Sequence, residues 1–213
     1  MSELRTEEEQ IEAFKNWWKK NGTSLVLAVA VGVGGYFGWQ AWQTSQANHM
    51  AEASSLYQSM MQSAADLSKE ENQKSVRFVA KQLADDYADT GYAMFAQLLT
   101  ARVDAQNGDY DAALDALRSA KAATEDTTFK VIADIRIARL LAEQKNYGEA
   151  LAVLGSINNA EFTSSVEELK GDILLAQGKR DDARAAYEKA TSNLNGSVNH
   201  PLLDIKLKDL VNS

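Results

Sequence analysis

The chain has 213 residues, enough for one compact domain and an appended segment. Its 22 lysine and arginine residues against 30 aspartate and glutamate residues give a net charge of −8, and this acidity argues against nucleic-acid binding. The sequence contains no cysteine and a single proline, which excludes disulfides and thiolate chemistry and favours helices over strands.

The first predicted element is a short amphipathic helix within residues 1–22. Thr6 followed by Glu9 matches a capping box, and apolar side chains then recur at helical spacing. Asn21-Gly22 is typical of a helix C-cap, so we expect this helix to end there, next to a membrane. It can serve as an interfacial anchor or, alternatively, as a docking helix for a cytoplasmic or membrane partner.

Residues 23–43 form the predicted transmembrane helix. No formally charged side chain occurs between Lys20 and Glu52, and the stretch from Ser24 to Trp42 is almost wholly apolar. At a rise of ~1.5 Å per residue this stretch is about 28 Å long, close to the ~30 Å hydrocarbon core of a bilayer. The region before it is long and acidic rather than short and basic, which favours an uncleaved anchor over a cleaved signal peptide.

Positive charges near this span lie on one side of it. Lys15, Lys19 and Lys20 precede it, whereas the sequence after it has no lysine or arginine before Lys69. The positive-inside rule therefore predicts a cytoplasmic N-terminus and a C-terminal domain, residues 44–213, outside the cytoplasm. The chain is thus predicted to be a single-pass protein of the bacterial inner membrane.

Small residues recur on one face of the predicted span. Ala30, Gly34 and Gly38 are spaced by four residues, so they align along one side of a helix. Lipid provides no hydrophobic drive for helix association, and small residues permit the close backbone approach that stabilises helix pairs in membranes. We predict that these three residues form a partner-binding face; the alternative is that glycine is simply common in membrane helices.

The C-terminal domain contains a repeated helix–turn–helix pattern. Tyr110 and Tyr147 lie 37 residues apart, and Ala150 and Ala183 lie 33 apart, close to the ~34-residue period of tetratricopeptide repeats (TPRs). Each first helix has a small residue, and each second helix a small and a large one, at matching positions. These sets are Ala101, Ala138 and Gly171; Ala113, Ala150 and Ala183; and Leu117, Leu154 and Tyr187.

This pattern predicts an all-α fold, with one N-terminal transmembrane helix followed by a TPR-like helical-repeat solenoid. Stacked TPR pairs form a groove that binds peptides or partner helices. Arg102 and Arg139 occupy the same position in successive first helices, as do Gln106 and Glu143. We predict that these four residues contact a partner in the groove, with ordinary solvated residues as the alternative.

The sequence shows no pattern typical of an enzyme. Its two histidines, His49 and His200, are far apart and lack the spacing of metal ligands. The serines do not form a nucleophile elbow. We therefore predict no catalytic residue, no metal site and no cofactor.

Several segments together resemble the YfgM family. They are residues 6–18, 21–22, 91–93, 136–139, 168–173 and 178–187. The resemblance implies an ancillary subunit of the SecYEG translocon, anchored in the lipid bilayer of the inner membrane, with a periplasmic TPR-like domain. It also implies that the protein works with the membrane-anchored periplasmic chaperone PpiD and helps exported nascent chains to pass to periplasmic chaperones. No catalytic residue carries over from the family.

The residues themselves leave two other roles open. A membrane-anchored TPR protein can instead be a scaffold of a different envelope complex, such as cell-wall or division machinery. Alternatively, the cytoplasmic helix within residues 6–20 can bind a soluble factor and regulate an envelope stress response.

Overall fold

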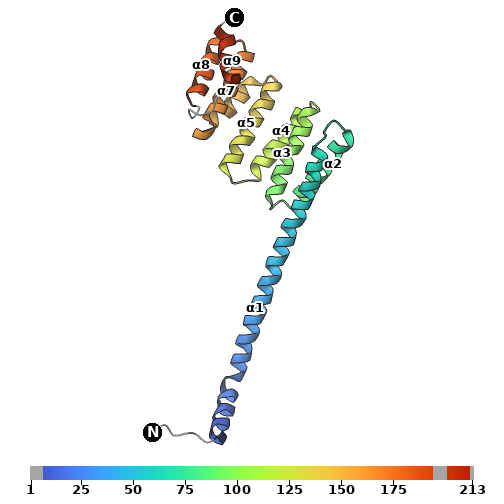
Figure 1. The fold of residues 1–213 in the computed structure, drawn as a ribbon, viewed down its shortest axis with the longest axis vertical. Coiled ribbons are helices and arrows are strands. Elements are labelled where there is room, and N and C mark those ends of the chain that lie inside the picture. Colours follow the sequence, from blue (N-terminus) through green and yellow to red (C-terminus); the bar gives the residue numbers. More distant parts are fainter. Residues whose placement is uncertain (1–6, 194–200, 212–213) are drawn as a thin grey trace. The chain divides into compact units, whose positions relative to one another are not determined.

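The computed structural model describes residues 7–193 and 201–211, and every regular element within them is a helix (Figure 1). The capping residue Thr6 and His200 lie outside these described residues. In chain order the elements are α1 (Glu7–Ala64), α2 (Glu70–Asp86), α3 (Gly91–Gln106), α4 (Tyr110–Ala122), α5 (Thr127–Glu143), α6 (Tyr147–Ser156), the 3-10 helix η1 (Ala160–Phe162), α7 (Thr163–Ala176), α8 (Arg180–Ser192) and α9 (Pro201–Val211).

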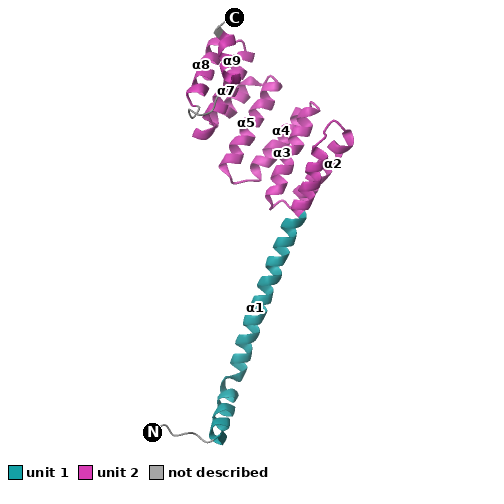
Figure 2. Cartoon of the chain, viewed as in Figure 1, with its two compact units in different colours: residues 1–52 teal, residues 53–213 magenta. Residues whose placement is uncertain are grey.

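The chain divides into two compact units, residues 1–52 and residues 53–213 (Figure 2). The first unit contains the apolar part of α1, which is the one helix in the described ranges that is long and apolar enough to cross a membrane. Every residue from Ser24 to Trp42 is exposed. This segment therefore differs from the core helix of a soluble domain, whose apolar side chains are buried.

The prediction that a helix ends at Asn21-Gly22 is wrong, because α1 continues through both residues. The Asn21 side chain donates a hydrogen bond to the backbone oxygen of Trp17, at 3.1 Å. The Trp18 ring covers Gly22, where an added Cβ would lie 3.0 Å from Trp18 Cε2. Glycine inside a helix costs only about 1 kcal/mol relative to alanine, so the apolar residues that follow continue the helix.

The second unit contains the helix pairs α3–α4, α5–α6 and α7–α8, which match the three predicted repeats. All of the small and large packing residues named from the repeats are buried. Leu117 of α4, Leu141 of α5, Leu154 of α6 and Ile173 of α7 belong to one continuous core. Each pair therefore buries apolar surface against its neighbour, as a solenoid requires. The predicted all-α fold class is confirmed.

The helices α7 and α8 cross at close range. A Cβ added at Gly171 would lie 2.4 Å from Tyr187 Cε1, so only glycine leaves room for this ring. The Tyr187 hydroxyl donates a hydrogen bond to Asp172 Oδ1 at 2.7 Å. Lys206 of α9 then donates to Asp172 Oδ2 at 2.9 Å and to Glu168 Oε1 at 2.7 Å. This network attaches the last described helix to the last pair.

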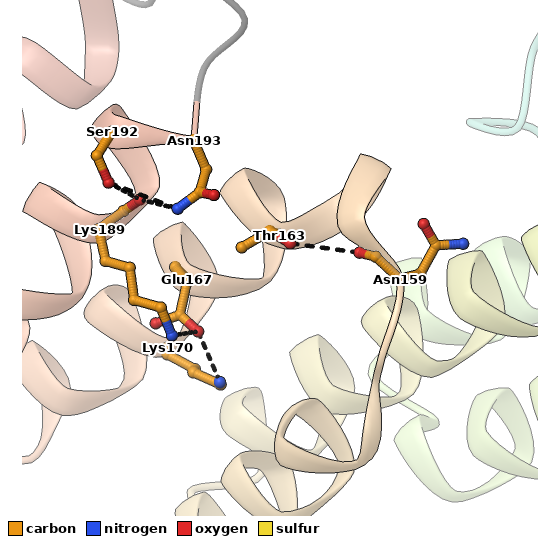
Figure 3. Close-up of polar contacts among 7 residues, drawn as sticks. All are labelled: Asn159, Thr163, Glu167, Lys170, Lys189, Ser192 and Asn193. Atoms are coloured by element: carbon orange, nitrogen blue, oxygen red, sulfur yellow. Dashed lines mark hydrogen bonds and ion pairs between the residues drawn. The ribbon is translucent and has the colours of Figure 1, made fainter.

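Two further buried carboxylates are paired with cations inside the second unit. Glu167 is 7 % exposed and accepts hydrogen bonds from Lys170 at 2.8 Å and from Lys189 at 2.9 Å (Figure 3). Burial raises the pKa of Glu167, but its two lysine partners outweigh burial and lower it. Asp104 of α3 is 5 % exposed and accepts a hydrogen bond from Arg77 Nε of α2 at 3.0 Å. These pairs leave no charge buried alone at either position.

The turns inside the three helix pairs share one backbone geometry. Gly108, Lys145 and Gly178 have φ angles of 77°, 62° and 77°, and each backbone N–H donates to the carbonyl three residues earlier. This left-handed conformation strains any residue that carries a Cβ. Lys145 is therefore the strained member of the set.

We expect Lys145→Gly to raise the free energy of unfolding by about 0.5–1 kcal/mol, because relief of strain exceeds the added entropy of the unfolded chain. Urea titration of the purified full-length protein, followed by circular dichroism, measures this change. Gly178→Lys is the matched control and should lower the same free energy. Equal stabilities of Lys145→Gly and the unsubstituted protein would show that the turn is not strained.

We also expect stability to fall above about pH 10 because of Tyr187. Burial, and then the hydrogen bond to Asp172, raise the pKa of Tyr187. At pH values between the unfolded and folded pKa, the unfolded state loses the phenolic proton while the folded state keeps it. The free energy of unfolding should then fall by up to about 1.4 kcal/mol per pH unit.

Urea titrations between pH 8 and pH 11 measure this slope. Tyr187→Phe cannot ionise, so its stability should fall less steeply over the same range. Identical slopes for the two proteins would contradict the assignment to Tyr187.

Candidate functional site

The second unit contains a groove with a volume of about 560 Å³. It is lined by the end of α1, by α3 and by α5, with Leu117 of α4. We call it the arginine groove because Arg102, Arg136 and Arg139 line it alongside a mostly apolar surface. The larger apolar residues are Tyr57, Met61, Phe95, Leu98, Leu99 and Leu140.

Helical periodicity explains why these residues share one surface. On α3, Phe95, Leu98, Arg102 and Ala105 follow one another at intervals of three or four residues, so they lie on the same face. The opposite face of α3 contributes Ala96 and other small residues to the core. The first helices of the first two pairs, α3 and α5, therefore pack with one face and present another to the groove.

Aromatic rings form part of the groove and its edge. The Tyr57 and Phe95 ring centroids are 6.2 Å apart, and Tyr57 also lies 5.5 Å from Tyr92. Phe95 meets Phe129 of α5 edge to face at 5.4 Å. Such pairs fix ring positions across three helices. The apolar surface offered by the groove is therefore held in place by neighbouring rings.

The three arginines of the groove differ from most cationic side chains of this unit. Arg102, Arg136 and Arg139 are exposed, and none forms a hydrogen bond or ion pair with the residues that the structure describes. No acidic residue is among the described residues that line the groove. By contrast, Arg77 and Arg118 are paired with carboxylates elsewhere in the unit. The groove therefore carries unneutralised positive charge in an acidic protein.

The structure separates the four groove residues predicted from the sequence. Arg102 and Arg139 line the arginine groove, whereas Gln106 and Glu143 are exposed and are not part of its lining. Sequence reasoning missed Arg136, since the equivalent position of the preceding repeat is Leu99. Positions 99 and 136 lie on matching helical faces but carry different residue types, so only the position in the repeat could have pointed to Arg136. A role in partner binding remains a prediction for all four.

The second predicted site is the small-residue face of α1, which lies wholly in the first unit. Ala30, Gly34 and Gly38 are all exposed. A Cβ added at Gly34 or Gly38 meets no other atom within 4 Å. Larger side chains can therefore be introduced there without a clash inside the described chain, which makes the predicted partner-binding face testable by substitution.

No group of three or more histidine, aspartate or glutamate side chains within residues 7–193 and 201–211 is placed to hold a metal ion. His49 lies in α1.

Comparison with known proteins adds a family and several relatives. The model of the tetratricopeptide repeat-like domain family matches residues 15–212. A Haemophilus influenzae protein is 29% identical over 204 residues, which are 96% of this chain and 97% of the relative. An Escherichia coli K12 protein is 25% identical over 210 residues, 99% of each chain. Both relatives are named ancillary SecYEG translocon subunits, so the resemblance found in the sequence is confirmed.

Proposed function

The chain belongs to the tetratricopeptide repeat-like domain family, and we propose that it is a non-enzymatic ancillary subunit of the SecYEG translocon. The observation that carries this proposal is the length of the likeness. It spans nearly all of this chain and of relatives that bear that name, so it includes both the apolar helix and the repeat domain. A likeness confined to the repeats would support only a generic protein-binding role.

In this proposal each unit has its own task. The apolar part of α1 spans the inner membrane once, with the lysine-flanked N-terminus in the cytoplasm and the repeat domain in the periplasm. The face formed by Ala30, Gly34 and Gly38 contacts a membrane helix of the translocon. The arginine groove then binds a polypeptide on the periplasmic side.

The polypeptide partner in the groove is proposed to belong to the export route itself. It is either the membrane-anchored periplasmic chaperone PpiD or a nascent chain that has just crossed the membrane. Binding there helps to transfer exported proteins to periplasmic chaperones. Support for a binding role comes from the partly exposed aromatic and aliphatic surface of the groove. Binding sites are typically concave and mostly apolar, with a few polar groups.

A mild-detergent pull-down of the tagged full-length protein, followed by mass spectrometry, tests the proposed association. Enrichment of SecY, SecE and SecG over a tagged unrelated single-pass protein is the expected result. Enrichment of another envelope complex without the translocon would favour the scaffold alternative. A variant that lacks residues 1–14 tests the regulatory alternative. Loss of its function with unchanged recovery of the translocon would favour regulation through the cytoplasmic helix.

We expect Gly34→Leu combined with Gly38→Leu to reduce recovery of the translocon severalfold, because two leucines prevent close helix approach. Ala28→Leu with Gly32→Leu is the matched control. It adds two leucines with the same spacing on a different face, about 120° around the helix, and should leave recovery unchanged. Equal effects of both double variants would exclude a specific helix interface.

Labelling of single cysteines tests the orientation, since the natural chain has no cysteine. Glu188 of α8 and Glu8 near the start of α1 are both exposed, so the substitutions Glu188→Cys and Glu8→Cys place one thiol on each side of the predicted span. An impermeant maleimide should label Glu188→Cys in intact spheroplasts and Glu8→Cys only after lysis. The reverse pattern would overturn the proposed topology.

A further inference from the structure

The three unpaired arginines of the arginine groove require an explanation. Most charged groups near the core of this unit have a partner of opposite charge, including the nearly buried Glu167 and Asp104. Arg102, Arg136 and Arg139 line one groove and have no such partner among the described residues. Like charges that share a groove repel one another, and a negatively charged occupant would neutralise them.

The groove offers two kinds of contact to an occupant. Its floor is apolar and aromatic, with Tyr57, Phe95 and Leu140 among its lining. Its charged groups are guanidinium groups, which bind carboxylates through paired hydrogen bonds. An occupant that uses both contacts carries large apolar side chains and, beside them, at least one carboxylate.

The walls of the groove also select the backbone conformation of the occupant. They are formed by α1, α3 and α5, whose backbone N–H and C=O groups are paired inside the helices themselves. An extended peptide would find no strand edge with which to pair its own backbone groups. A helix satisfies those groups internally, so it can enter an apolar groove without leaving them unpaired.

We propose that the arginine groove binds an amphipathic helix of a partner protein, with aliphatic or aromatic side chains on the inserted face and acidic side chains flanking it. This inference rests on the protein-binding role proposed above, and it specifies the chemistry of the segment that is bound. The apolar face supplies most of the buried area. The carboxylates neutralise the arginines and select acidic helices over basic ones.

The test uses the full-length protein in lipid nanodiscs, so that detergent does not compete for the groove. The probe is a fluorescent synthetic helix of about 18 residues, or five turns, with leucine and phenylalanine on one face and glutamate flanking it. A second probe has glutamine at every glutamate position. Fluorescence anisotropy should give at least about tenfold tighter binding of the glutamate probe, and the difference should shrink as salt rises.

Substitution of the arginines locates the binding site. Arg102→Ala with Arg139→Ala should weaken binding of the glutamate probe at least about tenfold and leave the glutamine probe nearly unaffected. Arg118→Ala is the matched control, because Arg118 is an exposed arginine of the same unit outside this groove. It should change neither affinity. Circular dichroism confirms that each variant is folded.

Charge reversal gives a result that general destabilisation cannot imitate. The variant with Arg136→Glu and Arg139→Glu should no longer bind the glutamate probe. It should bind more tightly a probe that has lysine in place of each glutamate. Failure of this exchange in a folded variant would overturn the proposal. Equal binding of the glutamate and glutamine probes, or equal effects of Arg118→Ala and the groove variants, would also overturn it.

Self-association is the competing explanation for the groove. If the occupant is a second copy of this chain, analytical ultracentrifugation would show a dimer that the groove variants convert to a monomer, and the proposal would be wrong. The inference and the proposed function fail separately. Translocon recovery without binding of the acidic helix removes only the inference, whereas charge-dependent binding without translocon recovery removes only the function.

Discussion

Close crossing of paired helices is the constraint on which the repeat domain depends. Gly171 of α7 leaves room for the Tyr187 ring of α8, and alanine is buried at the matching positions of the other two pairs, Ala101 and Ala138. Because the paired helices approach this closely, each first helix uses one face for its partner and leaves another face available. Such faces of α3 and α5, together with the end of α1 and Leu117 of α4, line the arginine groove. Ala101 and Leu117, the packing residues of the first pair, also line the groove, so a bulkier residue at Ala101 would change the shape of the groove directly.

Charge is distributed in the second unit in two contrasting ways. Near the core, Asp104 and Glu167 are each held by cations from the same or a neighbouring helix, so their charges are satisfied inside the fold. In the groove, Arg102 and Arg139 are not satisfied by any described residue. Pairing of Asp104 and Glu167 with cations favours the packed structure, because any packing that separated these pairs would leave a buried charge without a partner. The second arrangement leaves binding free energy available for a partner.

The repeat period made much of the fold predictable from the sequence. Ala101, Ala138 and Gly171 could be aligned by counting because their sizes are fixed by local helix crossing. The groove was predicted less completely, since its lining combines residues of α1 with residues of two repeats, and no period relates Tyr57 to Arg136. The stop expected at Gly22 was wrong for a related reason. A cap pattern involves only neighbouring residues. Here the Trp18 ring packs against Gly22, and the apolar residues beyond continue the helix.

The boundary between the two units falls inside α1 rather than in a loop. Ala53 and Met60 are fully buried in the second unit, and Tyr57 and Met61 of the same turns line the arginine groove. A soluble fragment prepared for crystallisation should therefore begin between the end of the apolar stretch and Ala53. A fragment that begins at α2 would lose the α1 residues that line the arginine groove together with part of its core. A protease that cuts within these turns would likewise separate part of α1 from the rest of the second unit.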